Sequence, residues 1–258
     1  MKRALIAFPM LLIAGAPLAA DAKLNEGTGE ASAAATSSFW EPDALFALKF
    51  MSDTPFRGVS GTDSKPGMSA LAEAYTGPFY VGTMWFNIDN GSADPQSAEW
   101  DLWVGVRPAF DNLRFDFNAN YAIDLPKQNA EYMEYKAGVE ADFIEGTTVG
   151  LNYFYSPDWR QLDVREDVVE ATAKYKIDDS WSVSGALGKS FMSAPVKDWT
   201  YWNAGVTYNV TPQVSLDLRY HDTDIRSADC VTRSACHARV VFSVNIAATA
   251  RQILAAVD

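Results

Sequence analysis

The residues with the most specific chemistry in this sequence are two cysteines and two histidines. Cys230 and Cys236 lie close together in the chain, His237 follows directly, and His221 precedes them. Their spacing matches no standard zinc motif, and two cysteines in an exported chain most often pair with each other. We therefore predict a disulfide between Cys230 and Cys236. The alternative is a metal site that the histidines would complete.

Carboxylates are numerous, but no pattern marks an acid–base pair held in a pocket. Glu99 and Asp101 would share one face of a strand, as the carboxylates of any polar strand face do. The sequence contains no nucleophile motif and no phosphate-binding loop. We therefore expect no enzymatic activity and no cofactor.

The charged residues instead alternate with apolar ones. In residues 113–121 the odd positions are apolar and the even positions are polar or charged. A strand sends successive side chains to opposite faces, so this segment has one apolar and one polar face. In a soluble sandwich the apolar face would pack on a second sheet. In a membrane barrel it would contact lipid, and the polar face would line the lumen.

About twelve such runs follow one another from Ala44 onward, and single-chain bacterial barrels have an even number of strands. The run from Phe79 to Asn87 is ambiguous, because Met84 and Phe86 place apolar groups on its second face as well. Short and long connections alternate, which is typical of a barrel with short periplasmic turns and longer extracellular loops. The predicted fold is therefore all-β, an antiparallel transmembrane β-barrel. A secreted soluble β-barrel or sandwich that binds a ligand is the alternative.

The aromatic residues of these runs support the barrel. Tyr and Trp favour the membrane interfaces, where the ring contacts lipid and the polar tip stays wet. Ten of them fall mostly near predicted strand ends on the apolar face: Trp100, Tyr121, Tyr135, Tyr153, Tyr155, Tyr175, Trp181, Trp202, Tyr208 and Tyr220.

The first residues have the pattern of a secretory signal peptide. Lys2 and Arg3 precede a short apolar run, and cleavage after either Ala20 or Ala22 would follow the small-residue rule. The run is too short for a transmembrane helix. The predicted organisation is a signal peptide at 1–22, a flexible lead-in at 23–43, the barrel at 44–246 and a C-terminal tail at 247–258.

The polar face of the predicted barrel carries both signs of charge, which favours mutual pairing over a strongly ion-selective ring. The predicted lumen-lining residues are Lys49, Glu99, Asp101, Arg114, Asp116, Glu134, Lys136, Glu140, Glu170, Lys174, Asp217, Arg219 and Arg239. The whole chain has 21 basic and 33 acidic residues, so nucleic acid is a poor partner for its surface.

Six ordered segments resemble the TorF family of porins, outer-membrane proteins of Gram-negative bacteria. They are RGVS at 57–60, GPFYVGT at 77–83, AEWDLWVG at 98–105, LNYFYSPD at 151–158, WNAGV at 202–206 and LDLRYHDT at 216–223. The resemblance spans most of the chain from Ala44 to Ile246 and implies an outer-membrane barrel without catalytic residues. One departure is the end of the chain: such barrels usually finish on an aromatic residue that the assembly machinery reads, whereas here residues 247–258 follow the last strand.

The expected function is passive diffusion of small polar solutes through an outer-membrane porin. The alternative in the membrane is a plugged barrel with a structural or adhesin role. The expected partners are outer-membrane lipid and lipopolysaccharide, the barrel assembly machinery, an unidentified polar solute and, in a homo-oligomer, further copies of the chain.

Overall fold

A computed structural model describes residues 40–89, 97–125, 131–230, 232 and 234–256. The predicted signal peptide and almost all of the lead-in lie outside these residues. Within the described part, no helix is long and apolar enough to span a membrane.

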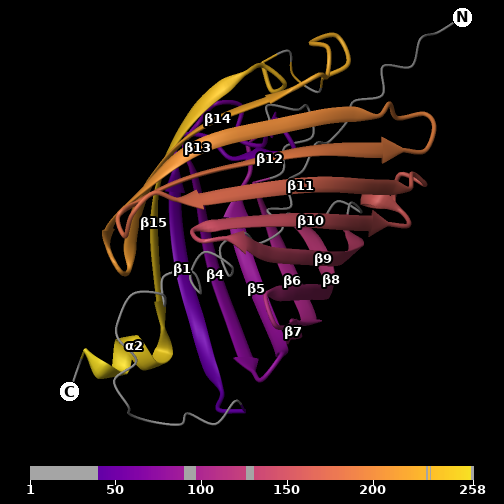
Figure 1. The fold of residues 1–258 in the computed structure, drawn as a ribbon. Helices are drawn as coiled ribbons and strands as arrows, with labels where there is room; N and C mark the ends of the chain where they lie inside the picture. The colour runs from indigo at the N-terminus through magenta and orange to yellow at the C-terminus, as the bar shows by residue number, and fades with distance from the viewer. Residues whose placement is uncertain (1–39, 90–96, 126–130, 231, 233, 257–258) are drawn as a thin grey trace, which may run out of the picture.

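Twelve antiparallel strands close into a barrel, which confirms the predicted fold class (Figure 1). Each strand pairs with the next along the chain, and β1 pairs with β15 to close the cylinder. The strands are β1 (Asp43–Met51), β4 (Gly67–Thr76), β5 (Phe79–Asn87), β6 (Ala98–Val106), β8 (Leu113–Leu125), β9 (Tyr132–Ile144), β10 (Thr147–Ser156), β11 (Glu166–Lys176), β12 (Trp181–Met192), β13 (Trp199–Thr211), β14 (Val214–Thr223) and β15 (Arg239–Thr249).

Five short elements accompany the barrel. The hairpin of β2 (Pro55–Phe56) and β3 (Val59–Ser60) lies in the connection between β1 and β4, and β7 (Ala109–Phe110) pairs with the start of β8. A 3₁₀ turn, η2 (Trp159–Gln161), lies between β10 and β11, and helix α2 (Ala250–Ala255) follows β15. We call the end with β2, β3 and η2 the long-loop end, and the opposite end the short-turn end.

Two strands extend beyond their predicted limits. β8 continues to Leu125 because residues 123–125 pair with 98–100 of β6, so this part of the predicted long loop is strand. β15 continues past Ile246 to Thr249, because Ala247 and Ala248 complete the pairing with β1. Residues 250–255 of the predicted tail form α2, which begins with a capping box between Thr249 and Gln252.

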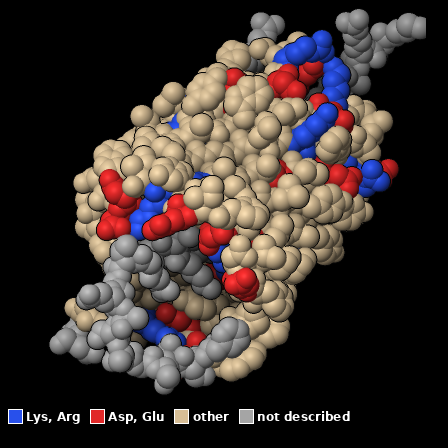
Figure 2. Space-filling model, in the orientation of Figure 1, with Lys and Arg blue, Asp and Glu red and all other residues tan. Residues whose placement is uncertain are grey.

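The outer face of the wall is apolar. Side chains such as Phe117, Leu151 and Leu187 alternate with inward ones and are exposed on the outside. Figure 2 shows a broad uncharged band across the barrel wall, with acidic and basic side chains gathered toward its two ends. An uncharged outer band is what a barrel wall in contact with lipid requires.

Aromatic side chains form two belts at the edges of this band. Trp181 and Tyr208 lie 4.6 Å apart, centroid to centroid, at the short-turn end, where Tyr175 is also exposed. Tyr135 and Tyr155 are 6.4 Å apart near the long-loop end. That second belt also contains Trp100, Tyr121, Tyr153, Trp202 and Tyr220. The two belts therefore follow the positions that membrane interfaces favour.

The inside of the barrel is partly apolar, which explains the ambiguous pattern of β5. Inward side chains of β1, β4, β5 and β6, together with Ile88 directly after β5, form a buried core cluster: Leu45, Ala47, Leu71, Tyr80, Met84, Phe86, Ile88 and Trp103. Met84 and Phe86 face inward, while Phe79 and Val81 face outward. These four strands therefore do not line an open polar channel along their whole length.

Candidate functional site

The candidate site is the interior of the barrel. All thirteen residues predicted to line the lumen lie on the strand faces opposite to the exposed apolar side chains. They divide by depth. Glu99, Asp101 and Glu134 lie toward the long-loop end and are buried. Lys136, near the middle of β9, and Glu140, toward the short-turn end, are partly exposed. The interior is therefore closed at one end and accessible to water at the other.

The first closure comes from the hairpin β2–β3, which folds inward and places Arg57 at its tip. The Arg57 guanidinium donates to Glu134 Oε2 of β9 at 2.8 Å and to Glu166 Oε2 of β11 at 2.9 Å. It also lies over the Phe154 ring of β10, 5.1 Å from the centroid. The Arg57 side chain is only 4% exposed. The hairpin thus reaches from β1 to the far wall of the barrel.

The tip of the hairpin depends on a tight backbone. Arg57 and Gly58 both have positive φ, at 44° and 83°. A Cβ on Gly58 would lie 2.6 Å from the Asp222 carbonyl oxygen, so only glycine fits against β14 here. On the other side, Trp199 Nε1 donates to the Arg57 carbonyl oxygen at 3.2 Å.

The second closure is the connection that contains η2, between β10 and β11. Arg160, with φ of 59°, points inward and is fully buried. Its guanidinium donates to Asp124 Oδ2 of β8 at 3.0 Å and to Glu99 Oε2 of β6 at 3.2 Å. Glu99 and Asp124 are directly opposite each other in the β6–β8 register, and like charges in such a pair repel. Arg160 therefore supplies the positive charge that this pair requires.

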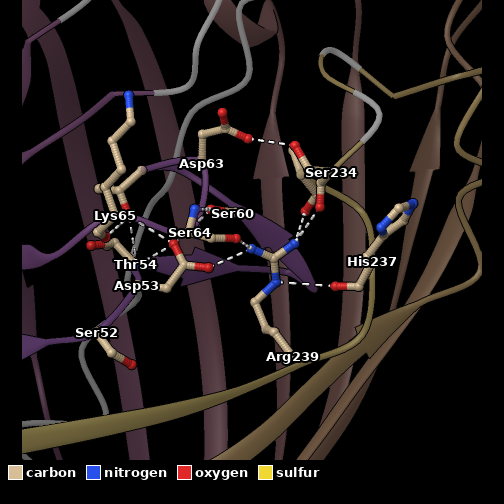
Figure 3. A network of polar contacts seen from close by, with 12 residues as sticks. Ser52, Asp53, Thr54, Ser60, Asp63, Ser64, Lys65, Ser234, His237 and Arg239 are labelled. Carbon is tan, nitrogen blue, oxygen red and sulfur yellow. Dashed lines mark hydrogen bonds and ion pairs between the residues drawn. The ribbon is translucent and has the colours of Figure 1, made fainter.

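A network of polar contacts attaches the hairpin to the connection between β14 and β15 (Figure 3). Arg239 forms an ion pair with Asp53 and donates to the Ser234 carbonyl oxygen at 2.9 Å. Asp53 also accepts hydrogen bonds from Ser60 and Thr62. The predicted lumen residue Arg239 is thus an anchor for the hairpin rather than part of a free lumen surface.

The two cysteines lie in the same connection. Cys230 and Cys236 are disulfide-bonded with Cα atoms 6.1 Å apart, and Cys236 and Ala235 pack on Val59 of the hairpin. Ser60 N donates to the Ala235 carbonyl oxygen at 2.8 Å. The cross-linked loop therefore packs directly on the hairpin.

The exposed side of this loop is held by a small charge cluster. Lys197 Nζ and Arg226 Nε both donate to Asp229, at 2.9 Å and 2.8 Å. These hydrogen bonds lower the pKa of the Asp229 carboxyl below its ordinary value. Asp229 therefore stays ionised and continues to attract both cations at neutral pH.

Toward the short-turn end the interior charges pair one by one. Asp116 accepts from Lys136 at 2.9 Å, and Asp217 accepts from Arg219 at 2.9 Å. Asp116 and Asp217 each have a cation within hydrogen-bond distance, so these two charges are balanced. Nearer the long-loop end, Glu170 accepts from the neutral Tyr201 hydroxyl at 2.8 Å.

The remaining predicted residues take two kinds of position. Arg114 lies at the short-turn rim and pairs with Asp142 and Glu140. Lys49 and Lys174 face the partly exposed interior on β1 and β11. The thirteen predicted lumen residues do not include Arg57 or Arg160. Sequence reasoning missed both, because they lie in connections that sequence patterns assign to solvent.

A closed antiparallel barrel with an apolar outer band and charged residues inside defines the porin-like class of outer-membrane barrels. Solved structures with this fold include two porins. The KdgM porin is 7% identical, with 79% of this chain and 98% of that chain covered and a TM-score of 0.55. The NanC porin is 8% identical, with 80% and 98% covered and a TM-score of 0.53. No curated protein sequence matches this chain.

A family model places the chain more narrowly. Residues 33–249 match the model of the Gcw_chp family, described as "Bacterial protein of unknown function". The chain therefore belongs to the Gcw_chp family.

Proposed function

We propose that this protein is an outer-membrane channel of the porin type through which small polar solutes diffuse passively. The observation that carries the proposal is the contrast between its two faces. The outer face is apolar between two aromatic belts, while the inner face of β8–β15 has partly exposed charged side chains such as Lys136, Glu140 and Arg219. Water-accessible charge inside a lipid-compatible wall is what a polar solute pathway needs.

Further parts of the proposal follow from the sequence. The six segments that resemble TorF porins support membership of that family, and the first 22 residues support export. The partners we propose are outer-membrane lipid and lipopolysaccharide, and the barrel assembly machinery. We assign no enzymatic activity to the chain.

A plugged barrel with a structural or adhesin role is the second candidate, and the two closures favour it. The Arg57 and Arg160 side chains are at most 4% exposed and each contacts two carboxylates of the wall. A channel therefore requires that at least one of these loops moves or leaves a path beside it.

Planar-bilayer recordings distinguish the two candidates. We expect discrete conductance steps from the wild type. Arg57→Gln removes the charge that attaches the hairpin to Glu134 and Glu166, so its steps should be larger or more frequent. Steps from neither protein would reject the channel and favour the plugged barrel. Heat-modifiable gel mobility of both proteins serves as the control for barrel formation.

A further inference from the structure

The connection between β10 and β11 contains a segment that is closed on itself. We call residues 158–164 the η2 segment. Trp159 N donates to the Val164 carbonyl oxygen at 2.7 Å, and Asp163 N donates to Asp158 Oδ1 at 2.8 Å. These two hydrogen bonds join the two ends of the segment to each other. The η2 segment therefore keeps its own shape and can move as one unit.

Few bonds attach the η2 segment to the rest of the barrel. Among the described residues, only its Arg160 and Gln161 side chains form hydrogen bonds with other elements. Arg160 forms ion pairs with Glu99 and Asp124, whereas Gln161 donates from an exposed position to the Glu131 carbonyl oxygen at 3.3 Å. The two ion pairs of Arg160 are therefore the main polar attachment of the segment.

The two side chains that the η2 segment inserts into the barrel each leave a donor without an acceptor. Trp159 Nε1 and Arg160 Nε are buried and donate to no described residue. The buried hydroxyl of Tyr132 on β9, whose ring packs on Trp159, has no described partner either. A buried polar group without a partner lowers stability. The closed position of the segment is therefore less favourable than its burial alone would make it.

The backbone of the η2 segment is strained as well. Arg160, Gln161 and Asp163 have φ of 59°, 54° and 55°, in the left-handed region that residues other than glycine rarely adopt. Such strain persists only where the surroundings hold it, and it is common in segments that switch between two positions. Here the ion pairs of Arg160 and the packing of Trp159 hold it.

The hairpin β2–β3 is attached much more firmly. Ser60 N donates to the Ala235 carbonyl oxygen at 2.8 Å, and the Gly61 carbonyl oxygen accepts from Asp89 N at 2.8 Å. The polar network in Figure 3 adds side-chain contacts to the connection between β14 and β15. Within residues 55–60, no buried side-chain nitrogen or oxygen lacks a partner. Of the two closures, the hairpin is therefore the fixed one.

We propose that the η2 segment is a lid that opens the long-loop end of the barrel while the hairpin β2–β3 stays in place. This inference rests on the proposed channel function and names the element that gates the channel. When the segment moves out, the Trp159 and Arg160 donors reach water. The opening then leads toward the partly exposed inward side chains of Asn118 and Lys136 on β8 and β9.

Cysteine accessibility tests which closure moves. Val164 in the η2 segment and Ser60 in the hairpin are both 1% exposed, so Val164→Cys and Ser60→Cys place thiols at equally buried positions. The native Cys230 and Cys236 are disulfide-bonded and do not react with maleimides. In detergent, a small water-soluble maleimide should label Val164→Cys at least about tenfold faster than Ser60→Cys, because local opening exposes only the η2 segment. Heat-modifiable gel mobility shows that each variant is folded.

The wild type offers a matched pair that needs no substitution. Arg57 and Arg160 are both trypsin sites, and their side chains are 4% and 0% exposed. Limited trypsin digestion followed by mass spectrometry should detect the cut after Arg160 before the cut after Arg57, because cleavage requires local opening.

Two further variants link the movement to current. Arg160→Met should speed labelling of Val164→Cys, whereas Arg57→Gln should leave that rate unchanged. In planar bilayers, maleimide-labelled Val164→Cys should stay open longer than the unlabelled protein, because the adduct prevents the η2 segment from returning to its buried position.

Three results would overturn the inference. Equal labelling rates at the two positions, or faster labelling of Ser60→Cys, would show that the hairpin moves at least as readily. No labelling of either variant in a protein that conducts would show that solutes pass beside two fixed closures, and the channel proposal would stand. Absence of current from the wild type, Arg57→Gln and Arg160→Met would overturn the channel proposal and this inference together.

Discussion

Arg160 is the residue whose removal should reveal most about the closed end of the barrel. Its guanidinium contacts Glu99 and Asp124 at 3.0–3.2 Å, and its side chain is fully buried. Arg160→Met keeps much of the side-chain volume but leaves two opposed carboxylates without a cation. Breaking a buried ion pair from one side costs about 3–5 kcal/mol, and we expect the free energy of unfolding to fall by that amount.

Lys65→Met supplies the comparison. Lys65 pairs with Asp89 at the same end, but the two side chains are 54% and 50% exposed, so its loss should leave the free energy of unfolding almost unchanged. Adding Glu99→Gln and Asp124→Asn to Arg160→Met should recover part of the lost stability, because the unpaired charges are removed too.

Urea unfolding of protein refolded into lipid vesicles, followed by Trp fluorescence, measures the free energy of unfolding of Arg160→Met, of Lys65→Met and of the triple variant. Bilayer conductance of Arg160→Met should also rise, since the connection that contains η2 loses its attachment to β6 and β8. If Arg160→Met were no less stable than Lys65→Met and conducted like the wild type, the ion pair would not hold this closure in place.

Four further variants test other parts of the structure. Phe117→Arg places a charge on the lipid-facing side of β8 and should cost about 2–4 kcal/mol, whereas Asn118→Arg faces inward and should change conductance more than folding; equal effects on vesicle folding would contradict the assigned faces. Replacing Cys230 and Cys236 by serine should remove at most about 2–3 kcal/mol, leave heat-modifiable mobility intact and speed proteolysis of the loop; failure to insert would contradict this. Gly58→Ala should raise conductance without loss of heat-modifiable mobility, because its Cβ would displace the hairpin tip from β14; unchanged conductance would show that the tip does not limit the path.

The sequence was sufficient to predict the wall, because a barrel strand records its two environments in alternate residues. β8 illustrates this: Phe117 and Tyr121 face outward while Asp116 and Asn120 face inward. The order of the strands also followed, because short connections force neighbouring runs to pair. The limits of β8 and β15 were less certain, since pairing with a neighbour, rather than composition, extends each strand.

The closed interior could not be predicted from the same pattern. Arg57 and Arg160 lie in polar connections, and their carboxylate partners are far away in sequence, on strands whose residues look like ordinary polar positions. One signal was present in β5, where Met84 and Phe86 add apolar groups to the inward face. Apolar side chains inside a barrel need something to pack against, so such a pattern indicates a filled interior.

The pairing of β1 with β15 has a consequence for how the barrel forms. The first and last strands meet with Leu45 opposite Thr249, so the final hydrogen-bonded seam joins the two most distant parts of the barrel chain. Contacts of such long sequence separation form slowly, and until then both strands present unpaired edges that can recruit another chain. Arg251 of α2, which reaches back to Glu41 and Asp43 beside β1, brings the two edges together at the short-turn end. Until this seam forms, the unpaired edges of β1 and β15 are therefore the part of the chain most exposed to aggregation.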